Sequence, residues 1–227
     1  MRRALALVTA LAALALAPAA QAKVIELGAD SNPASPSASC PDNCQAIGRV
    51  SGYMGRSGKG ANPFRIPRAG KLVAFTVSLG KPDANQVKFF TDLYGGPPQV
   101  RISVVRAGKT RKTRLTHRLL RQSPLFRVDH YFGSSPTFVF DTPIPVSKGN
   151  IVALTVPTWA PAFAVNLSRS NWWRSSRAKG KCGDVSQNAA QKTPGALRVY
   201  GCTYFKARLM YTVTYVPDPR TTDGTKG

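Results

Sequence analysis

Six short segments rich in β-branched and aromatic residues recur along the chain after its first seventy residues. They span residues 71–80, 99–106, 126–132, 137–142, 151–157 and 204–217, each bounded by Gly, Pro, Asn or Ser. Segments of this composition and spacing are typical of antiparallel strands. In the last one Leu209, Tyr211 and Val213 fall on one face, because side chains alternate along a strand. The sequence therefore predicts an all-β fold, an antiparallel two-sheet β-sandwich of jelly-roll type.

Two further patterns refine this prediction. Apolar residues recur at helical spacing within 85–96, and Gly95 is suited to end a helix, so we expect one short helix there. The pair Gly149-Asn150 lies between two strand-like runs and predicts a hairpin turn. The glycine-rich stretch GYMGRSGKGANP (52–63) is interpreted as a flexible basic loop, because it departs from the spacing of a phosphate-binding Walker motif.

The chain begins with MRRALALVTALAALALAPAAQA, a pattern typical of a secretory signal peptide. Arg2 and Arg3 supply the positive start, residues 4–17 are almost entirely apolar, and a small-x-small sequence suited to signal peptidase follows. The apolar stretch is shorter than the ~20 residues that a membrane-spanning helix needs. We therefore expect residues 1–22 to be removed after Ala22, leaving a secreted chain without an integral membrane segment.

The remaining chain divides into three parts by composition. Residues 23–44 are rich in Pro, Ser and Ala and predict an N-terminal arm that carries a small disulfide loop. Residues 45–217 hold the strand-like segments and have the length of a single β-sandwich domain. Residues 218–227 are polar and rich in turn-forming residues, which predicts a flexible tail.

Four cysteines in an exported chain indicate two disulfides, for which three connectivities exist: they are Cys40, Cys44, Cys182 and Cys202. We favour Cys40–Cys44 and Cys182–Cys202. The first pair flanks a tight Pro-Asp-Asn turn, and the second closes a loop of about 20 residues, which the chain-entropy model values at ~3 kcal/mol. Without a paired C-x-x-C and with both histidines distant in sequence, no metal is expected.

The charge balance is strongly basic. The chain has 32 Lys and Arg against 10 Asp and Glu, a net charge of +22, and removal of Arg2 and Arg3 leaves +20. Such a field attracts polyanions, and salt weakens the attraction. Candidate partners are anionic wall polymers, acidic polysaccharides, anionic lipid headgroups and extracellular DNA. The alternative is a general bias that only keeps the protein soluble.

A hairpin tip between the second and third predicted strands concentrates these charges. Lys109, Arg111, Lys112 and Arg114 are its basic residues, and we assign them a polyanion contact. The alternative is a solvated loop end without a partner. Nucleic acid is the less favoured polyanion, because the run lacks the interleaved aromatic residues that stack on bases.

The stretch SNWWRSSRAKGKCG (170–183) places two adjacent tryptophans before a basic loop. Trp172 and Trp173 must project to opposite faces of a strand, so one can fill the core while the other meets solvent or a ligand. A sugar ring packs on an exposed indole, and guanidinium groups bind carboxylate or sulfate. The candidate ligand-binding residues are Trp172, Trp173, Arg174, Arg177 and Trp159, the last at a proline-flanked strand end. The alternative is that both neighbouring indoles are covered.

Catalytic patterns are sparse. After the leader the chain has one glutamate and nine aspartates, and no sequence signal pairs two carboxyl groups as glycoside hydrolysis requires. Asp129 and His130 are neighbours that would point to opposite faces of a strand. No G-x-S-x-G nucleophile motif occurs, and His117 with His130 makes a weak metal site. We expect no cofactor.

The segments GKLVAFTVSLG, VRISVVR and FDTPIPVSKGNIVALTVP, with the closing Cys182–Cys202 region, resemble secreted jelly-roll modules, among them many carbohydrate-binding modules. The resemblance covers about residues 70–217 and implies a β-sandwich that presents aromatic residues to a glycan. The sequence thus favours a secreted, non-catalytic module that binds a polysaccharide or another anionic polymer of the cell envelope or matrix. The alternatives are a secreted glycan-active hydrolase or lyase, and a structural extracellular protein without a small ligand.

Overall fold

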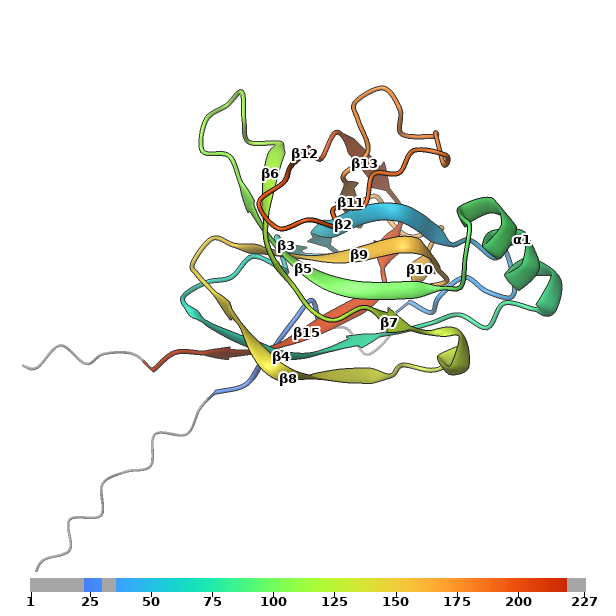
Figure 1. Ribbon diagram of the computed structural model, residues 1–227, viewed down its shortest axis with the longest axis horizontal. Coiled ribbons are helices and arrows are strands. Elements are labelled where there is room, and N and C mark those ends of the chain that lie inside the picture. The colour runs from blue at the N-terminus through green and yellow to red at the C-terminus, as the bar shows by residue number, and fades with distance from the viewer. Residues whose placement is uncertain (1–22, 30–35, 220–227) are drawn as a thin grey trace, which may run out of the picture.

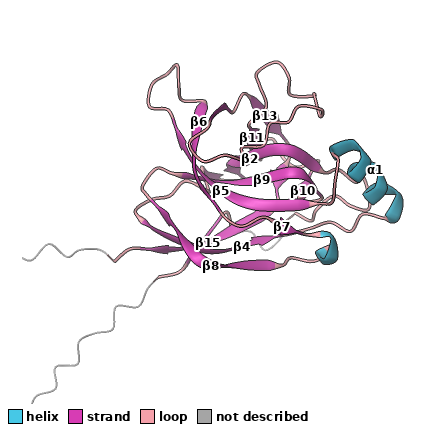
Figure 2. Cartoon of the chain, in the orientation of Figure 1, coloured by secondary structure: helices cyan, strands magenta, loops and turns pink. Residues whose placement is uncertain are grey.

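The computed structural model describes residues 23–29 and 36–219, which form two antiparallel β-sheets stacked on each other (Figure 1). Within these residues strands dominate, and a single α-helix lies at one end of the sheets (Figure 2). The predicted all-β sandwich with one short helix is therefore confirmed. The predicted signal peptide (1–22) and residues 220–227 of the predicted tail lie outside the described residues.

The smaller sheet has four strands. In spatial order they are β1 (Ile25–Leu27), β15 (Tyr211–Pro217), β4 (Gly70–Val77) and β8 (Thr137–Val146). Strand β1 belongs to the segment that the sequence assigned to an arm, yet Leu27 pairs with Val213 of β15 and is buried. The sandwich therefore includes residues that precede the predicted domain boundary.

The larger sheet has nine strands. Along its main path they are β12 (Leu197–Val199), β6 (Thr116–Gln122), β5 (Gln99–Ala107), β9 (Ile151–Ala160), β2 (Ile47–Ser57), β11 (Trp172–Ser175) and β13 (Cys202–Phe205). Two short strands extend it, β3 (Gly60–Ala61) beside β2 and β7 (Phe126–Arg127) beside β5. A separate short pair is formed by β10 (Phe163–Ala164) and β14 (Arg208–Leu209).

The main core lies between the two sheets. Phe75 of β4 and Val213 of β15 face Ile102 of β5 and Leu154 of β9, and all four are fully buried. Residues on the other face of β5 and β9 enter a second, smaller cluster with Leu119 and Tyr200. The alternation of side chains along these strands thus supplies two separate hydrophobic layers to one sheet.

The helix α1 (Ala84–Tyr94) agrees with the prediction for residues 85–96. Asp83 caps its start: the Gln86 backbone N–H donates to Asp83 Oδ1 at 2.9 Å, and the Asp83 N–H donates to Gln86 Oε1 at 3.0 Å. Gly95 ends the helix with a φ of 69°, and its N–H donates to the Thr91 carbonyl. The buried side of the helix carries Phe90 and Tyr94 onto the end of β9.

The interpretation of residues 52–63 as a flexible loop is wrong for its first half, which belongs to the central strand β2. Glycine has a low preference for strands, so the sequence pattern hides this element. Here the glycines allow aromatic rings to lie on the backbone. A Cβ on Gly52 would sit 2.7 Å from the ring of Trp173, and one on Gly55 would collide with the ring of Trp172.

Two other predictions need correction. The Gly149-Asn150 turn exists, but β8 pairs with β4 whereas β9 pairs with β2 and β5, so the turn carries the chain between sheets and forms no hairpin. The predicted strand 126–132 is shorter than expected: β7 gives way to a 3-10 turn (Asp129–Tyr131). Local sequence propensity predicts neither the pairing partners of β8 and β9 nor the length of β7, because strand pairing depends on long-range packing.

Both favoured disulfides are present, Cys40–Cys44 and Cys182–Cys202. The second closes the long connection between β11 and β13 and holds its base to the larger sheet. Within residues 23–29 and 36–219, no helix has both the length and the apolar character needed to cross a bilayer.

Candidate binding sites on the larger sheet

The two neighbouring tryptophans of β11 face opposite ways. Trp173 is 3% exposed, stacks on Tyr204 with ring centroids 4.5 Å apart, and meets Phe163 edge to face inside the main core. Trp172 is partly exposed and lies flat against Gly55 on the outer side of the sheet. Of the pair, Trp172 is therefore the indole that a ligand on the outer face would meet.

Trp159, a candidate ligand-binding residue from the sequence, is not accessible to a ligand. It is fully buried near the end of β9, where Phe90 of α1 packs on its ring at 5.2 Å between centroids. Its indole Nε1 donates to the Gly96 carbonyl at 3.1 Å. The helix covers this strand end, and a helix that packs on a distant strand cannot be placed from local sequence.

The two arginines of the candidate site have different environments. Arg177 is 7% exposed and donates through its Nη atoms to the carbonyls of Cys182 (3.2 Å) and Gly48 (3.3 Å), so it ties the disulfide loop to β2. Arg174 is partly exposed; its Nη1 donates to the Tyr200 carbonyl at 3.3 Å, and its guanidinium lies 5.9 Å from the Trp172 ring centroid. Arg174 and Trp172 thus form a small cation–aromatic surface.

The predicted hairpin tip is the β5–β6 connection, residues 108–115, although β6 was not among the predicted strands. Its basic residues are all exposed: Lys109, Arg111, Lys112 and Arg114. Among the described residues, ion pairs form at Lys88–Asp92 and Arg127–Asp129, His130 lies 4.0 Å from Asp129, and none of these contacts involves the tip. In Figure 1 the tip and the long β11–β13 connection both rise on the side away from the smaller sheet.

The strands below the tip also place like charges together. Arg106 of β5 pairs directly with Arg118 of β6, and both side chains are exposed. Like charges directly opposite each other in an antiparallel pair destabilise the sheet. The positive charges on the larger sheet thus repel one another and do not help the sheet to fold.

A covering segment, residues 176–196, lies across the outer face of the larger sheet. Ser51 on β2 shows how it is held: its backbone N–H donates to Ser176 Oγ at 2.8 Å, and its Oγ accepts from the Gln191 N–H at 3.0 Å. Gln191 Nε2 also donates to the His117 carbonyl at 3.1 Å. A face that would otherwise meet solvent becomes a buried polar layer.

His117 belongs to this layer and is fully buried. Its Nδ1 lies 3.0 Å from the Leu115 carbonyl, which can only accept, so Nδ1 carries the proton and Nε2 accepts from the Tyr53 hydroxyl at 3.1 Å. Burial lowers the pKa of His117 to about 4. The histidine is therefore a neutral structural group at physiological pH, and within the described residues it belongs to no cluster of three or more His, Cys, Asp or Glu that could hold a metal ion.

A cationic cleft of about 660 Å³ opens beside the covering segment. Three basic side chains line it: Arg49, Arg101 and Lys192. The rest of the lining mixes neutral polar residues, such as Gln99 and Asn188, with apolar ones such as Leu125, and neither Asp nor Glu lines it. The cleft therefore offers several donors and a positive potential to an anionic, hydroxyl-rich ligand.

Arg49 is held in place by an unusual backbone. Its φ is 52°, a left-handed conformation that is costly for a residue with a Cβ, and it forms the bulge between Gly48 and Val50 of β2. The bulge aims the side chain along the cleft wall, where Nε donates to the Tyr94 carbonyl (3.3 Å) and Nη1 to the Ser186 carbonyl (3.2 Å). Strained bulges of this kind occur often at binding sites, where they redirect one side chain.

Arg101 projects from the outer face of β5 next to Thr155 of β9, its direct pairing partner. Its Nη1 donates to Gln122 Oε1 at 3.1 Å, whereas its buried Nε has no hydrogen-bond partner among the described residues. Partial burial lowers the pKa of Arg101. A partly desolvated guanidinium without a carboxylate gains more from an incoming anion than a fully hydrated one does.

The sequence did not single out these cleft residues. Arg49 was hidden because its strand was not recognised, and Lys192 lies in an irregular connection. A signal existed for Arg101: it alternates with buried apolar residues in the predicted strand 99–106, so it had to face outward. The sequence could not show which residues of other segments would join it.

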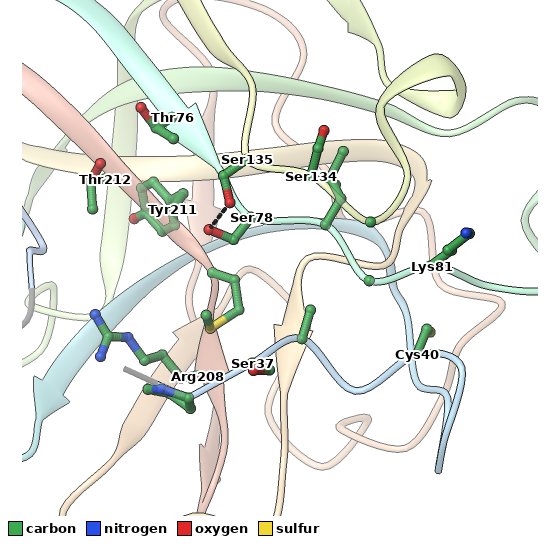
Figure 3. A pocket seen from close by; sticks show the side chains of 16 residues that line it. Ser37, Cys40, Thr76, Ser78, Lys81, Ser134, Ser135, Arg208, Tyr211 and Thr212 are labelled. Atoms are coloured by element: carbon green, nitrogen blue, oxygen red, sulfur yellow. Dashed lines mark hydrogen bonds between the residues drawn. The ribbon is translucent and has the colours of Figure 1, made fainter. Parts of the chain in front are cut away.

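Another cavity, of about 490 Å³, lies between residues 36–40, the end of β4 and the start of β15 (Figure 3). Serine and threonine hydroxyls line much of it, and Ser135 Oγ donates to Ser78 Oγ at 2.9 Å. No Asp, Glu or His is among its lining residues. The cations of Lys81 and Arg208 supply the charge of this cavity.

Comparison of the chain with known proteins finds no matching family model, no matching curated protein and no matching solved structure.

Proposed function

We propose that this protein is a secreted, non-catalytic module that binds an acidic polysaccharide of the cell envelope or matrix through the outer side of its larger sheet. The cationic cleft carries the proposal, because it combines Arg49, Arg101 and Lys192 with neutral donors and without a lining carboxylate. Guanidinium groups bind sugar carboxylates or sulfates in fork geometry, and amide side chains bind hydroxyl groups. The signal-peptide pattern and the two disulfides support an extracellular site of action.

The surrounding charge extends the cleft into a longer track. Across residues 45–69, 99–127 and 151–208, which form the larger sheet and its connections, Asp184 is the single acidic residue of the sequence. A polymer bound in the cleft would therefore meet further cations on the same side, including those of the hairpin tip. The surface formed by Trp172 and Arg174 offers an aromatic face for a sugar ring at the edge of this track.

The proposal is tested by measuring affinity for polygalacturonate and for uncharged dextran at low and high salt. The double variant Arg101→Gln/Lys192→Gln should weaken polygalacturonate binding about tenfold or more, which corresponds to loss of a charge-assisted contact. The control Lys71→Gln/Lys148→Gln removes the same charge from exposed positions outside the larger sheet. It should change affinity by less than about twofold if its two charges make no direct contact.

Two results would overturn the proposal. If the cleft variant and the control lose the same affinity for polygalacturonate, the net positive charge alone accounts for binding. The same conclusion follows if single-stranded DNA and polygalacturonate bind equally well at every salt concentration. Trp172→Ala separates the cleft from the aromatic surface: a loss confined to this variant would move the site to β11.

A further inference from the structure

A second pocket, distinct from the cationic cleft, lies at the other side of the Gly48–Arg49 bulge. It encloses about 340 Å³ between the start of β2, β10 and the connection from β13 to β14. Its walls are largely apolar: Ile47, Phe163, Val165, Trp173, Tyr204 and Val185. No Asp or Glu lines it, whereas Arg177 and Lys206 do. The pocket is therefore apolar in its body and positive in its charge.

Two hydrogen-bond donors of the lining residues have no acceptor. The indole Nε1 of Trp173 and the Nε of Arg177 are buried, and neither has a hydrogen-bond partner within the described residues. The side chains themselves are 3% and 7% exposed. Buried polar side-chain atoms are nearly always paired in folded proteins, and both unpaired donors belong to residues that line this pocket. A ligand that brings acceptor oxygens would supply the missing acceptors.

The backbone beside the pocket enters the left-handed region at two residues, of which Lys206 is the strained one because asparagine adopts this conformation readily. Asn166 has a φ of 60° and Lys206 a φ of 58°, and both residues line the cavity. The two segments are joined, since the Leu167 N–H donates to the Lys206 carbonyl at 3.0 Å. Left-handed conformations of residues other than glycine and asparagine are costly and gather at ligand sites, where the surrounding structure enforces them.

We propose that this pocket binds a small amphipathic carboxylate, an aromatic or short-chain acid. Its apolar body would pack among Phe163, Val165 and Val185. Its two carboxylate oxygens would accept hydrogen bonds from Trp173 Nε1 and Arg177 Nε, with the Lys206 ammonium balancing the charge. A neutral ligand would leave both cations uncompensated, and a sugar acid would place hydroxyl groups against apolar walls. This site does not depend on the polysaccharide proposed for the cleft.

Phenylacetate and hexanoate are suitable probes, because each joins a carboxylate to a compact apolar body. Titration of the ¹⁵N-labelled protein should shift the indole N–H signal of Trp173 saturably, and Trp173→Phe identifies that signal. The Trp159 indole N–H already donates to the Gly96 carbonyl, so its NMR signal should not shift and serves as an internal control. Hexanamide, methyl phenylacetate and galacturonate should bind at least tenfold more weakly than the two acids.

Variants locate the charge requirement. Lys206→Gln should weaken phenylacetate binding about tenfold, the equivalent of one favourable charge contact, whereas Lys181→Gln, at an exposed position of the disulfide loop, should leave it unchanged. The Arg101→Gln/Lys192→Gln protein should bind phenylacetate like the parent, which keeps this test separate from that of the polysaccharide. A Trp173 signal that does not move, equal binding of the amide, or equal loss in both lysine variants would each overturn the proposal. Tighter binding of galacturonate than of phenylacetate would also overturn it, since it would make the pocket part of the polymer site.

Discussion

The outer faces of the two sheets are built differently. On the smaller sheet the outer face is open: Val139 of β8 is 71% exposed, and the hydroxyls of Thr76 and Thr137 meet at 2.7 Å in solvent. On the larger sheet the covering segment buries part of the outer face, so that Leu119 and His117 are inaccessible. One sheet thus packs through a single face and the other through both.

The charges follow the same division. The smaller sheet and its flanks include Glu26, Asp141 and Asp218, whereas Asp184 is the lone acid in the segments that form the larger sheet. The buried polar layer gives the larger sheet rigid positions from which cations such as Arg101 project. The covering segment on the larger sheet therefore does two things: it stabilises the fold, and it positions a charged surface.

The largest expected effect tests whether the covered face is a true core. Leu119→Ala should lower the free energy of unfolding by about 2–5 kcal/mol, because it leaves a cavity under the covering segment. The matched change on the open face, Val139→Ala, should alter it by no more than about 0.5 kcal/mol. Urea denaturation of both variants measures the difference. Similar values would mean that the covering segment does not seal the larger sheet.

An intermediate effect comes from His117, because its pKa is about 4 in the folded protein and near 6.5 when unfolded. Between these values the unfolded chain binds the extra proton, so the stabilising contribution is complete above pH 6.5 and declines as the pH falls toward 4. Between pH 7 and pH 5 the loss should be about 2 kcal/mol.

Denaturation at a series of pH values measures this loss. His117→Gln should flatten the decline between pH 7 and pH 5, and His130→Gln, at an exposed position, should keep the parent profile. A parent-like decline in the His117 variant would show that other groups in the covered layer titrate there.

The smallest effect concerns the like charges of β5 and β6. Arg106→Gln should raise the free energy of unfolding by about 0.2–1 kcal/mol at low salt, because it removes repulsion from Arg118. The gain should shrink in high salt, where charges on the surface are screened. Lys71→Gln on the smaller sheet, which faces Pro145 and Val216, should produce no such gain. A gain that persists unchanged in high salt would contradict an electrostatic cause.

Part of the candidate site could be read from particular residues. Alternation along β11 required Trp172 and Trp173 to face opposite ways, and the structure shows which one is buried. The basic residues of the hairpin tip are exposed, as expected for a turn between two strands. Trp159 was misplaced because α1, which lies about seventy residues earlier, packs on it. Arg49 and Lys192 were missed because neither a bulge nor an irregular connection has a periodic signal.

The sequence by itself determined the strand-rich architecture, the position of the helix, the favoured disulfide pairing and the excess of positive charge. These properties are local or additive: alternation, capping residues, cysteine spacing and charge need no knowledge of distant partners. The tertiary structure alone decided that β2 is a central strand, that the Gly149-Asn150 turn joins two sheets, and that three cations from separate segments share one cleft. Those outcomes depend on which surfaces pack together, and side-chain shape across long sequence separations decides that packing.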